Sequence, residues 1–284
     1  MPAEAPRAAP QAAPRAGLRA RAPRLGLRAI ALGYLGLLLA IPVGMVFYRA
    51  FEHGVSAAWQ SVTTPDAIHA FWLTLLMVAI AVPLNTVFGI AAALLLARRR
   101  FRGRALLGAL IDLPFAVSPI VIGLALILVY GQSGWFGQTL SSVGIQVIFS
   151  LPGMALATIF VSLPFVVREV LPVLRELGTE QEDAAATLGA SSWQTFWRIT
   201  LPAIRWGAAY GVVFTTARAL GEFGALSVVS GHIVGRTETL TLQVEDRFQA
   251  FDLTGAYSAA VVLALMAMVV ILTTSMLNSR RKEA

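Results

Sequence analysis

Long apolar runs alternate with short polar segments along almost the whole chain. Six of these runs are long enough, at about 1.5 Å per residue, to cross roughly 30 Å of hydrocarbon. Backbone polar groups inside a bilayer must be satisfied within the chain, so runs of this length are expected to be helices rather than strands. The pattern predicts an all-α polytopic protein with about six transmembrane helices, at residues 27–49, 71–97, 105–130, 145–167, 206–230 and 253–277.

Composition supports lipid as the main solvent. Of 284 residues, 57% are hydrophobic and 13% are charged, and the mean hydropathy is +0.73. A water-soluble chain of this length cannot hide so much apolar surface. The sequence has no cysteine, which excludes disulfides, thiolate metal sites and cysteine nucleophiles.

Residues 1–24 consist largely of Ala, Pro and Arg and offer little to pack. We expect them to form a disordered basic arm on the cytoplasmic side. A cleaved signal peptide is the alternative, but the apolar run that follows is longer than a typical signal-peptide core, and further spans follow it. The expected organisation is therefore an arm at 1–24 and a transmembrane domain at 25–284.

Basic residues orient the predicted bundle. Eighteen of the 22 lie on one side: six in residues 1–28, five in 98–104, four in 168–205 and three at 280–282. Cytoplasmic loops carry the excess of Lys and Arg. We therefore expect both termini and the loops 98–104 and 168–205 to face the cytoplasm, and the net charge of +7 to reflect membrane orientation rather than a nucleic-acid partner.

Prolines interrupt several runs. Proline at membrane depth frees carbonyls that neighbouring helices must satisfy. Kinks that serve packing are the favoured interpretation, and discontinuous helices that line a pathway are the alternative. The positions are Pro83, Pro114, Pro119, Pro152 and Pro164.

The loop 168–205 is too polar to span a membrane, yet it is patterned. Thr179 and Glu182 have the spacing of a capping box, and Ser191 and Gln194 have the spacing of a second one. Gly189 is placed to end the first helix. We expect two short helices joined at Gly189, with Leu201-Pro202 closing the second.

The two predicted helices differ in their side chains. Ala184, Ala185 and Ala186 leave the first almost bare, so that a partner's groove could approach its backbone. Trp193, Phe196 and Trp197 form a stripe on the second at helical spacing. Docking to a partner and an amphipathic hairpin lying on the membrane surface both fit this pattern.

The segment Asp183-Ala184-Ala185-x-x-x-Gly189, followed after nine residues by Ile199-x-Leu201-Pro202, resembles the EAA loop of ABC importer permeases. In that family the loop forms the coupling helix that sits in a cleft of the cytoplasmic ATPase. Aspartate stands here where the family usually has glutamate, and Glu182 lies beside it. The resemblance implies a type I importer permease fold (MetI-like) and ATPase coupling through Glu182, Asp183, Ala184, Ala185, Gly189, Ile199, Leu201 and Pro202.

Further stretches between about 70 and 270 resemble the sulfate/thiosulfate permeases of the CysW type. They are Val82–Asn85, Val87–Gly89, Ile111–Pro119, Phe149–Met154 and Ala217–Gly231. The resemblance implies a heterodimer with a CysT-type permease, two copies of a CysA-type ATPase and a periplasmic binding protein that delivers sulfate or thiosulfate. Molybdate and tungstate permeases share much of this pattern and are the alternative substrate class.

Charged and polar residues inside predicted spans are the pathway candidates. Arg218 and Glu222 are four residues apart, so each can neutralise the other, as a structural pair or as part of a gate. Asp112 is expected to be satisfied by backbone freed at Pro114 or by polar neighbours. Asn85, Ser118 and Ser227 are tentative pathway residues, with helix–helix hydrogen bonds as the simpler role.

Residues for catalysis are scarce. His53, His69 and His232 are the only histidines, and they form no H-E-x-x-H motif. The single lysine, Lys282, lies in no phosphate-binding G-x-x-x-x-G-K-[ST] motif, so this chain is not expected to bind ATP. We expect a transport subunit without catalytic residues, metal or cofactor, whose partner ATPase binds ATP and Mg²⁺. A polytopic membrane enzyme and an ATP-independent channel or carrier are the other classes; neither accounts for the cytoplasmic motif.

Overall fold

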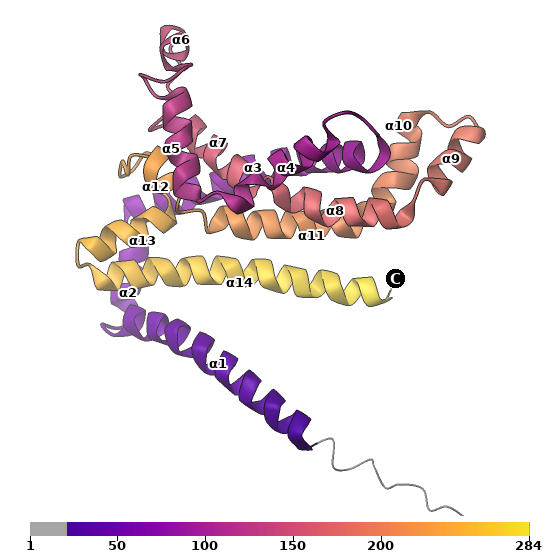
Figure 1. Ribbon diagram of the computed structural model, residues 1–284. Helices are drawn as coiled ribbons and strands as arrows, with labels where there is room; N and C mark the ends of the chain where they lie inside the picture. The colour runs from indigo at the N-terminus through magenta and orange to yellow at the C-terminus, as the bar shows by residue number, and fades with distance from the viewer. Residues whose placement is uncertain (1–21, 284) are drawn as a thin grey trace, which may run out of the picture. The chain divides into compact units, whose positions relative to one another are not determined.

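A computed structural model describes the backbone of residues 22–283 and the side chains of residues 30–273. The chain divides into two compact units, Met1–Tyr48 and Arg49–Ala284. The arm expected at 1–24 lies outside the described residues except for its last three positions, where the first helix has already begun. Helices, joined by turns and irregular segments, are the regular secondary structure of the described residues (Figure 1).

The first half of the chain contains α1 (Ala22–Phe51), α2 (Val55–Val62), α3 (Pro65–Arg98), α4 (Arg104–Ala116), α5 (Pro119–Tyr130) and α6 (Gly137–Ser142). The second half contains α7 (Leu151–Ser162), α8 (Pro164–Leu177), α9 (Glu180–Thr187), α10 (Ser192–Thr195), a π-helical turn (Phe196–Thr200), α11 (Leu201–Leu220), α12 (Leu226–Val229), α13 (Leu240–Gln249) and α14 (Leu253–Glu283).

Among the described residues, four segments are long and apolar enough to cross a membrane: Ile30–Phe51, Pro65–Arg98, Leu151–Leu177 and Leu253–Thr273. A fifth span results if α4 and α5 count as one broken span. The fourth predicted run, 145–167, is displaced, because its helical segment begins at Leu151 and continues to Leu177.

The predicted continuous span 105–130 is wrong. The chain bends by 114° between α4 and α5. Val117 and Ser118 are extended there, each with ψ 136°. Pro119 lacks an N–H and disfavours helical geometry at the residue before it, so the helix stops and restarts. This is the discontinuous-helix alternative rather than a packing kink.

The other prolines behave differently. Pro83 lies inside α3, which continues through it. Pro152 and Pro164 stand in the first turns of α7 and α8, where the missing N–H leaves no bond unmade.

The predicted span 206–230 is not among the described segments that are long and apolar enough to cross a membrane. Its helix, α11, begins at Leu201 and ends at Leu220, and Gly221 is its C-cap. The chain then makes a short turn before α12. Leu201 and Pro202 do not close the preceding short helix, because Pro202 stands in the first turn of α11 and the chain stays helical there.

Within the second unit, α3, α8, α11 and α14 run side by side (Figure 1). Small residues allow this close packing. A Cβ added at Gly211 of α11 would lie 2.8 Å from the Cα of Val166 in α8, and one at Gly89 of α3 would lie 2.5 Å from the Val166 Cβ. Glycine at both positions therefore lets α3 and α11 pack directly on α8.

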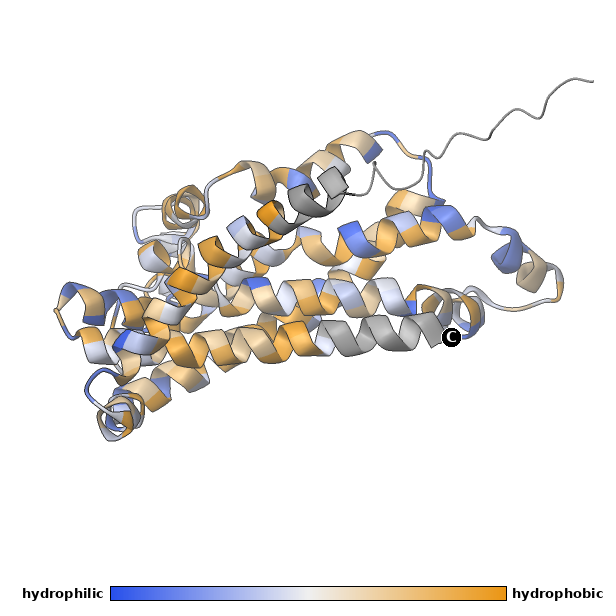
Figure 2. Ribbon diagram, turned by 90° about the horizontal axis from the view of Figure 1, so that it is seen from below, coloured by the Kyte–Doolittle hydropathy of each residue, from blue (hydrophilic) through white to orange (hydrophobic). Residues whose placement is uncertain are grey.

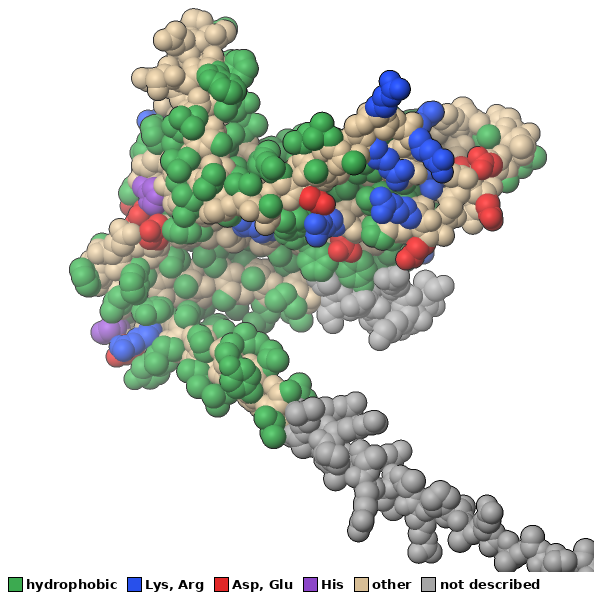
Figure 3. Space-filling model, viewed as in Figure 1, with side chains coloured by type: hydrophobic (Ala, Val, Ile, Leu, Met, Phe, Trp, Pro, Cys, Tyr) green, Lys and Arg blue, Asp and Glu red, His purple; other side chains and the backbone are tan. Residues whose placement is uncertain are grey.

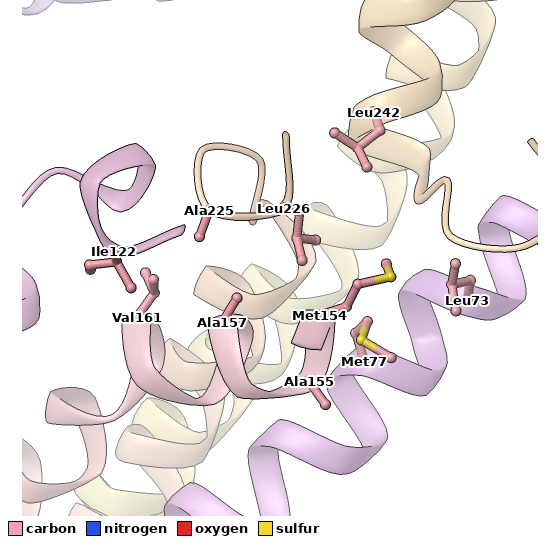
Figure 4. Packing of buried hydrophobic residues seen from close by; sticks show 10 residues of the cluster. All are labelled: Leu73, Met77, Ile122, Met154, Ala155, Ala157, Val161, Ala225, Leu226 and Leu242. Carbon is pink, nitrogen blue, oxygen red and sulfur yellow. The ribbon is translucent and has the colours of Figure 1, made fainter. Parts of the chain in front are cut away.

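Two apolar clusters hold the unit together. One surrounds α7, where Met154 and Ala157 meet Met77 of α3 and Leu226 of α12 (Figure 4). The other joins α3, α8 and α11 through Ala93, Val170 and Ile204. Figure 2 shows apolar residues along the long helices and polar residues toward their ends, as expected for a bundle with lipid around its middle.

Candidate functional site

The EAA-like motif of residues 183–202 forms a hairpin between α8 and α11, at one end of the second unit (Figure 1). Gly189 ends α9 in a left-handed conformation, with φ +83°. Its N–H bonds to the Ala186 carbonyl, and the next N–H, of Ala190, bonds to the Ala185 carbonyl. This pair of bonds is the Schellman motif, so the prediction that Gly189 joins two short helices is confirmed.

The two predicted capping boxes have different outcomes. The Ser191–Gln194 box is present, with both of its reciprocal hydrogen bonds. The Thr179–Glu182 box is wrong, because the Thr179 side chain makes no capping bond. The Glu182 side chain instead pairs with Arg98 and Thr200.

Glu182 anchors the hairpin to the bundle. Its carboxylate lies 2.9 Å from Arg98 Nε at the end of α3 and accepts a 3.1 Å bond from Arg98 Nη2. It also accepts a 2.9 Å bond from the Thr200 hydroxyl in the π-helical turn. Arg98 Nη1 donates to the Leu174 carbonyl of α8. The Glu182 carboxylate therefore ties α9 to α3 and to the π-helical turn, and Arg98 in turn ties α3 to α8.

The rest of the motif divides into exposed and half-buried positions. Asp183, Ala184 and Gly189 are exposed, whereas Ala185 and Ile199 are half-buried, as is Leu201. Pro202 is exposed. Glu182 thus acts within the chain, while its neighbours remain available to a partner.

The predicted aromatic stripe is a cluster of rings in mutual contact. Trp193 and Trp197 meet edge to face at 5.4 Å, and Phe196 lies 5.4 Å from Trp197. Trp193 is 69% exposed, and Leu188 of the turn is 89% exposed. Exposed aromatic residues at a hairpin tip are the residue types enriched at protein interfaces.

Charged side chains gather at this end of the unit, over the segments next to α9 and α10 (Figure 3). Sequence reasoning grouped Arg98 with the orienting arginines and assigned no role to Thr200. Both residues are identified as partners of Glu182 only by their hydrogen bonds in the folded structure. Along the chain, Glu182 is 18 residues from Thr200 and 84 residues from Arg98. The single sequence signal was that Arg98 directly follows the second apolar run.

Arg218 and Glu222 form an ion pair, with Arg218 Nη2 2.7 Å from Glu222 Oε2. Glu222 is buried, and its Oε1 accepts the N–H of Ala225 at 2.8 Å. Its backbone carbonyl accepts the Thr241 hydroxyl. The carboxylate thus closes the turn between α11 and α12, which is the structural role considered for this pair.

The tentative polar pathway residues share no hydrogen bond with one another among the described residues. Asn85 is buried and donates to Ser162 Oγ and to the Ile159 carbonyl, so it joins α3 to α7. Ser227 Oγ donates to the Gly224 carbonyl within its own turn. Ser118 is exposed at the bend between α4 and α5.

Asp112 has a partner that the sequence did not predict. Its Oδ1 accepts a 3.0 Å bond from Nε of Arg168 in α8. Arg168 was expected in a cytoplasmic loop; it lies instead in the span Leu151–Leu177. The polar hairpin is correspondingly shorter than 168–205, because 168–177 belong to α8 and 201–205 to α11.

A second polar cluster lies at the opposite end, between α12 and α13. His232 Nδ1 lies 2.8 Å from Asp246 Oδ1, and its Nε2 lies 3.1 Å from the Ser227 carbonyl. Glu238 is buried beside this pair. Burial, followed by the negative charge of Asp246, raises the pKa of Glu238 to about 7.

Comparison with known proteins identifies the family. Residues 85–282 match the binding-protein-dependent transport system inner membrane component family. The chain belongs to this family. It is therefore a permease subunit of an ABC importer, a transport component of the inner membrane and not an enzyme.

Individual relatives agree with this family. The permease is 55% identical over 252 residues to the sulfate transport system permease protein CysW of Synechocystis, covering 89% of this chain and 91% of the relative. It is 49% identical over 253 residues to the Escherichia coli K12 CysW, covering 88% and 87%. It is 38% identical over 247 residues to the sulfate transport system permease protein CysT of the same strain, covering 87% and 89%.

Among solved structures, the permease resembles a bacterial ABC transporter involved in alginate import, with TM-score 0.76 over 92% of this chain and 96% of the other. Sequence identity is only 18%, so this likeness concerns the fold alone. It confirms the predicted type I ABC importer permease fold.

Proposed function

We propose that this permease carries sulfate across the inner membrane, with thiosulfate as a second tetrahedral substrate, and that a separate ATPase drives it. The observation that carries the proposal is the 55% identity to a sulfate transport permease across 89% of the chain. A molybdate or tungstate permease remains the alternative substrate class.

The proposed assembly has four kinds of chain. This permease pairs with a CysT-type permease. Its own sequence is 38% identical to that of the Escherichia coli CysT protein. A dimer of CysA-type subunits binds ATP and Mg²⁺ on the cytoplasmic side, and a periplasmic protein delivers the anion. Both termini of this permease face the cytoplasm, on the side of the hairpin and of the arginines at 98–104.

The proposed coupling element is the hairpin between α8 and α11. Its exposed positions, among them Asp183, Ala184 and Leu188, form the surface that the ATPase contacts. Glu182 holds the hairpin on α3 and α8. A push on α9 is therefore transmitted to the bundle, which switches access from one side of the membrane to the other.

Uptake of radiolabelled sulfate tests this function. The host is a sulfate-auxotrophic strain that lacks this subunit, supplied with the partner subunits, with or without this gene. Restored uptake that resists a modest excess of molybdate is the expected result. Uptake of molybdate without sulfate would keep the ABC permease assignment and reject the substrate.

A further inference from the structure

The ion pair between Arg168 and Asp112 is half exposed within apolar segments. Their side chains are 56% and 49% exposed, and Nε of Arg168 lies 3.0 Å from Oδ1 of Asp112. The guanidinium also lies 4.4 Å from the centre of the Phe115 ring, which packs edge to face on Phe165. These side chains come from α4 and α8, far apart in the sequence.

Asp112 is four residues before the end of α4 and Arg168 four residues after the start of α8, but each lies far from the other end of its helix, next to the arginines at 98–104 or to the hairpin. Arg168 lies nine residues before the end of α8 and Asp112 eight residues after the start of α4, or about 14 and 12 Å along the helix axes. Charged side chains at such depth face protein or water rather than lipid. The exposed side of this pair therefore faces the partner subunit or a water-filled path.

The ion pair with Asp112 engages only one of the three guanidinium nitrogens of Arg168. Nε is the only Arg168 nitrogen that donates a hydrogen bond to another described residue. Its two terminal amino groups, with four N–H donors, donate to no other described residue. A planar edge of such donors matches two oxygens of a tetrahedral oxyanion, and the Phe115 ring beneath the guanidinium limits its rotation.

Arg218 is a poorer candidate for the same role. Its partner Glu222 is 1% exposed at the side chain and closes a turn, and Arg218 itself is 27% exposed. Arg168 is paired instead with an exposed acid that makes no other hydrogen bond among the described residues. Asp112 can therefore give up its contact without leaving a buried charge unpaired.

On these grounds, and resting on the proposed function, we infer that Arg168 binds the transported oxyanion during passage and that Asp112 is its exchangeable counter-ion. With no anion present, Asp112 neutralises the guanidinium. When a dianion arrives, the terminal N–H groups bind it, and the nearby carboxylate keeps that binding weak. A transport path needs sites weak enough to release what they bind.

The test measures radiolabelled sulfate bound to the purified complex of both permeases and the ATPase, without the binding protein, at fixed ionic strength. Arg168→Gln should weaken sulfate binding about ten-fold or more, and Arg168→Lys should weaken it less, because charge remains without the planar fork. Asp112→Asn should strengthen binding and slow sulfate uptake. A purely structural pair predicts no such opposite shifts.

The matched control is Arg49→Gln, which breaks another exposed ion pair, Arg49–Glu52 at 2.9 Å. Sulfate binding by this variant should not change. Equal shifts for Arg168→Gln and Asp112→Asn, or no shift in either, would overturn the inference. So would loss of co-purification with the second permease in Arg168→Gln, because the pair would then hold the subunit interface.

Failure of the proposed substrate gives a different result. If the wild-type complex binds and transports molybdate but not sulfate, the sulfate assignment fails. The same variants are then measured with molybdate, which is also a tetrahedral dianion. Opposite shifts with molybdate would still support the role of Arg168, and equal shifts would reject it.

Discussion

The Glu182 carboxylate of α9 lies 2.9 Å from the Nε of Arg98, the last residue of α3. The side chains of the two residues are 22% and 17% exposed, so the pair is largely shielded from water. Thr200 donates to the same carboxylate. The position of the hairpin on the bundle therefore depends on one acid.

Replacing Glu182 should loosen the hairpin. Glu182→Ala removes the acceptor for Arg98 and Thr200, and hydrogen bonds to charged groups contribute about 1.5–3 kcal/mol each at most. We expect faster trypsin cleavage after Arg198 and less sulfate transported per ATP hydrolysed. Limited proteolysis of the purified complex and paired uptake and ATPase assays measure the two effects.

Asp183→Ala is the control for this variant, because Asp183 is exposed and makes no side-chain bond among the described residues. It should leave trypsin cleavage unchanged. Equal cleavage in both variants would mean that the Glu182 contacts do not hold the hairpin.

Substitutions of Gly189 can distinguish the effect of backbone strain from the effect of a side chain that blocks contact with the ATPase. A non-glycine residue at its φ of +83° costs about 1–2 kcal/mol, and no atom of this chain lies within 4 Å of an added Cβ. Gly189→Ala and Gly189→Leu should therefore be similarly stable. If the ATPase covers this turn, only the leucine variant should uncouple ATP hydrolysis from sulfate uptake while remaining in the membrane.

Gly54 provides the matched control, with φ +93° and equally open space. Gly54→Ala and Gly54→Leu should behave alike in uptake and ATP hydrolysis. Normal sulfate uptake by Gly189→Leu would count against a coupling role for the hairpin turn.

Single substitutions of Arg218 and Glu222 should lower the stability of the folded protein by different amounts. Glu222→Ala removes the buried acceptor of the Ala225 N–H as well as the arginine's partner. Breaking a buried ion pair costs about 3–5 kcal/mol. Arg218 is more exposed, but Arg218→Gln leaves the buried carboxylate without its countercharge. The double variant Arg218→Gln/Glu222→Ala should recover part of the stability, because it leaves neither charge without a partner.

Thermal unfolding of the detergent-solubilised complex measures this cycle. A coupling energy near zero would contradict the structural role and favour a gating role. Sulfate uptake by the double variant then shows whether the charges themselves are needed for transport.

Glu238 predicts a pH dependence of stability. Its folded-state pKa of about 7 lies above the ordinary 4.5, so the folded protein holds this proton more tightly than the unfolded chain does. The free energy of unfolding should be highest below pH 4.5 and fall as the pH rises toward 7, by up to about 3 kcal/mol. Around Glu238, Asp246 and Asp66 raise its pKa, while Arg247 and His232 lower it.

Glu238→Gln should flatten this slope, because glutamine is neutral at every pH. Unfolding temperatures of wild type and variant, measured from pH 5 to 8, test it. Parallel curves would show that Glu238 is ionised throughout.

The class of fold and the local turns of the EAA-like motif could be predicted from the amino-acid sequence. Runs of apolar residues predict an all-helical membrane protein and the approximate position of most long helices, because both depend on local composition. The Schellman turn at Gly189 and the box at Ser191 are likewise local, since their partners lie within five residues.

Contacts between residues far apart in the sequence are set by the packing of the helices. Pro119 disfavours helical geometry at Ser118, yet Pro83 lies inside a helix that continues through it. A proline in the run 105–130 therefore does not by itself predict the 114° bend. Glu182 had a local capping partner available in Thr179 and bound Arg98 instead, because a charged partner in a shielded site is the stronger one. Asp112 likewise pairs with an arginine far away in the sequence, Arg168, which lies 56 residues further along the chain. Side-chain pairing of this kind depends on how helices pack, and the spacing of residues along one chain does not encode it.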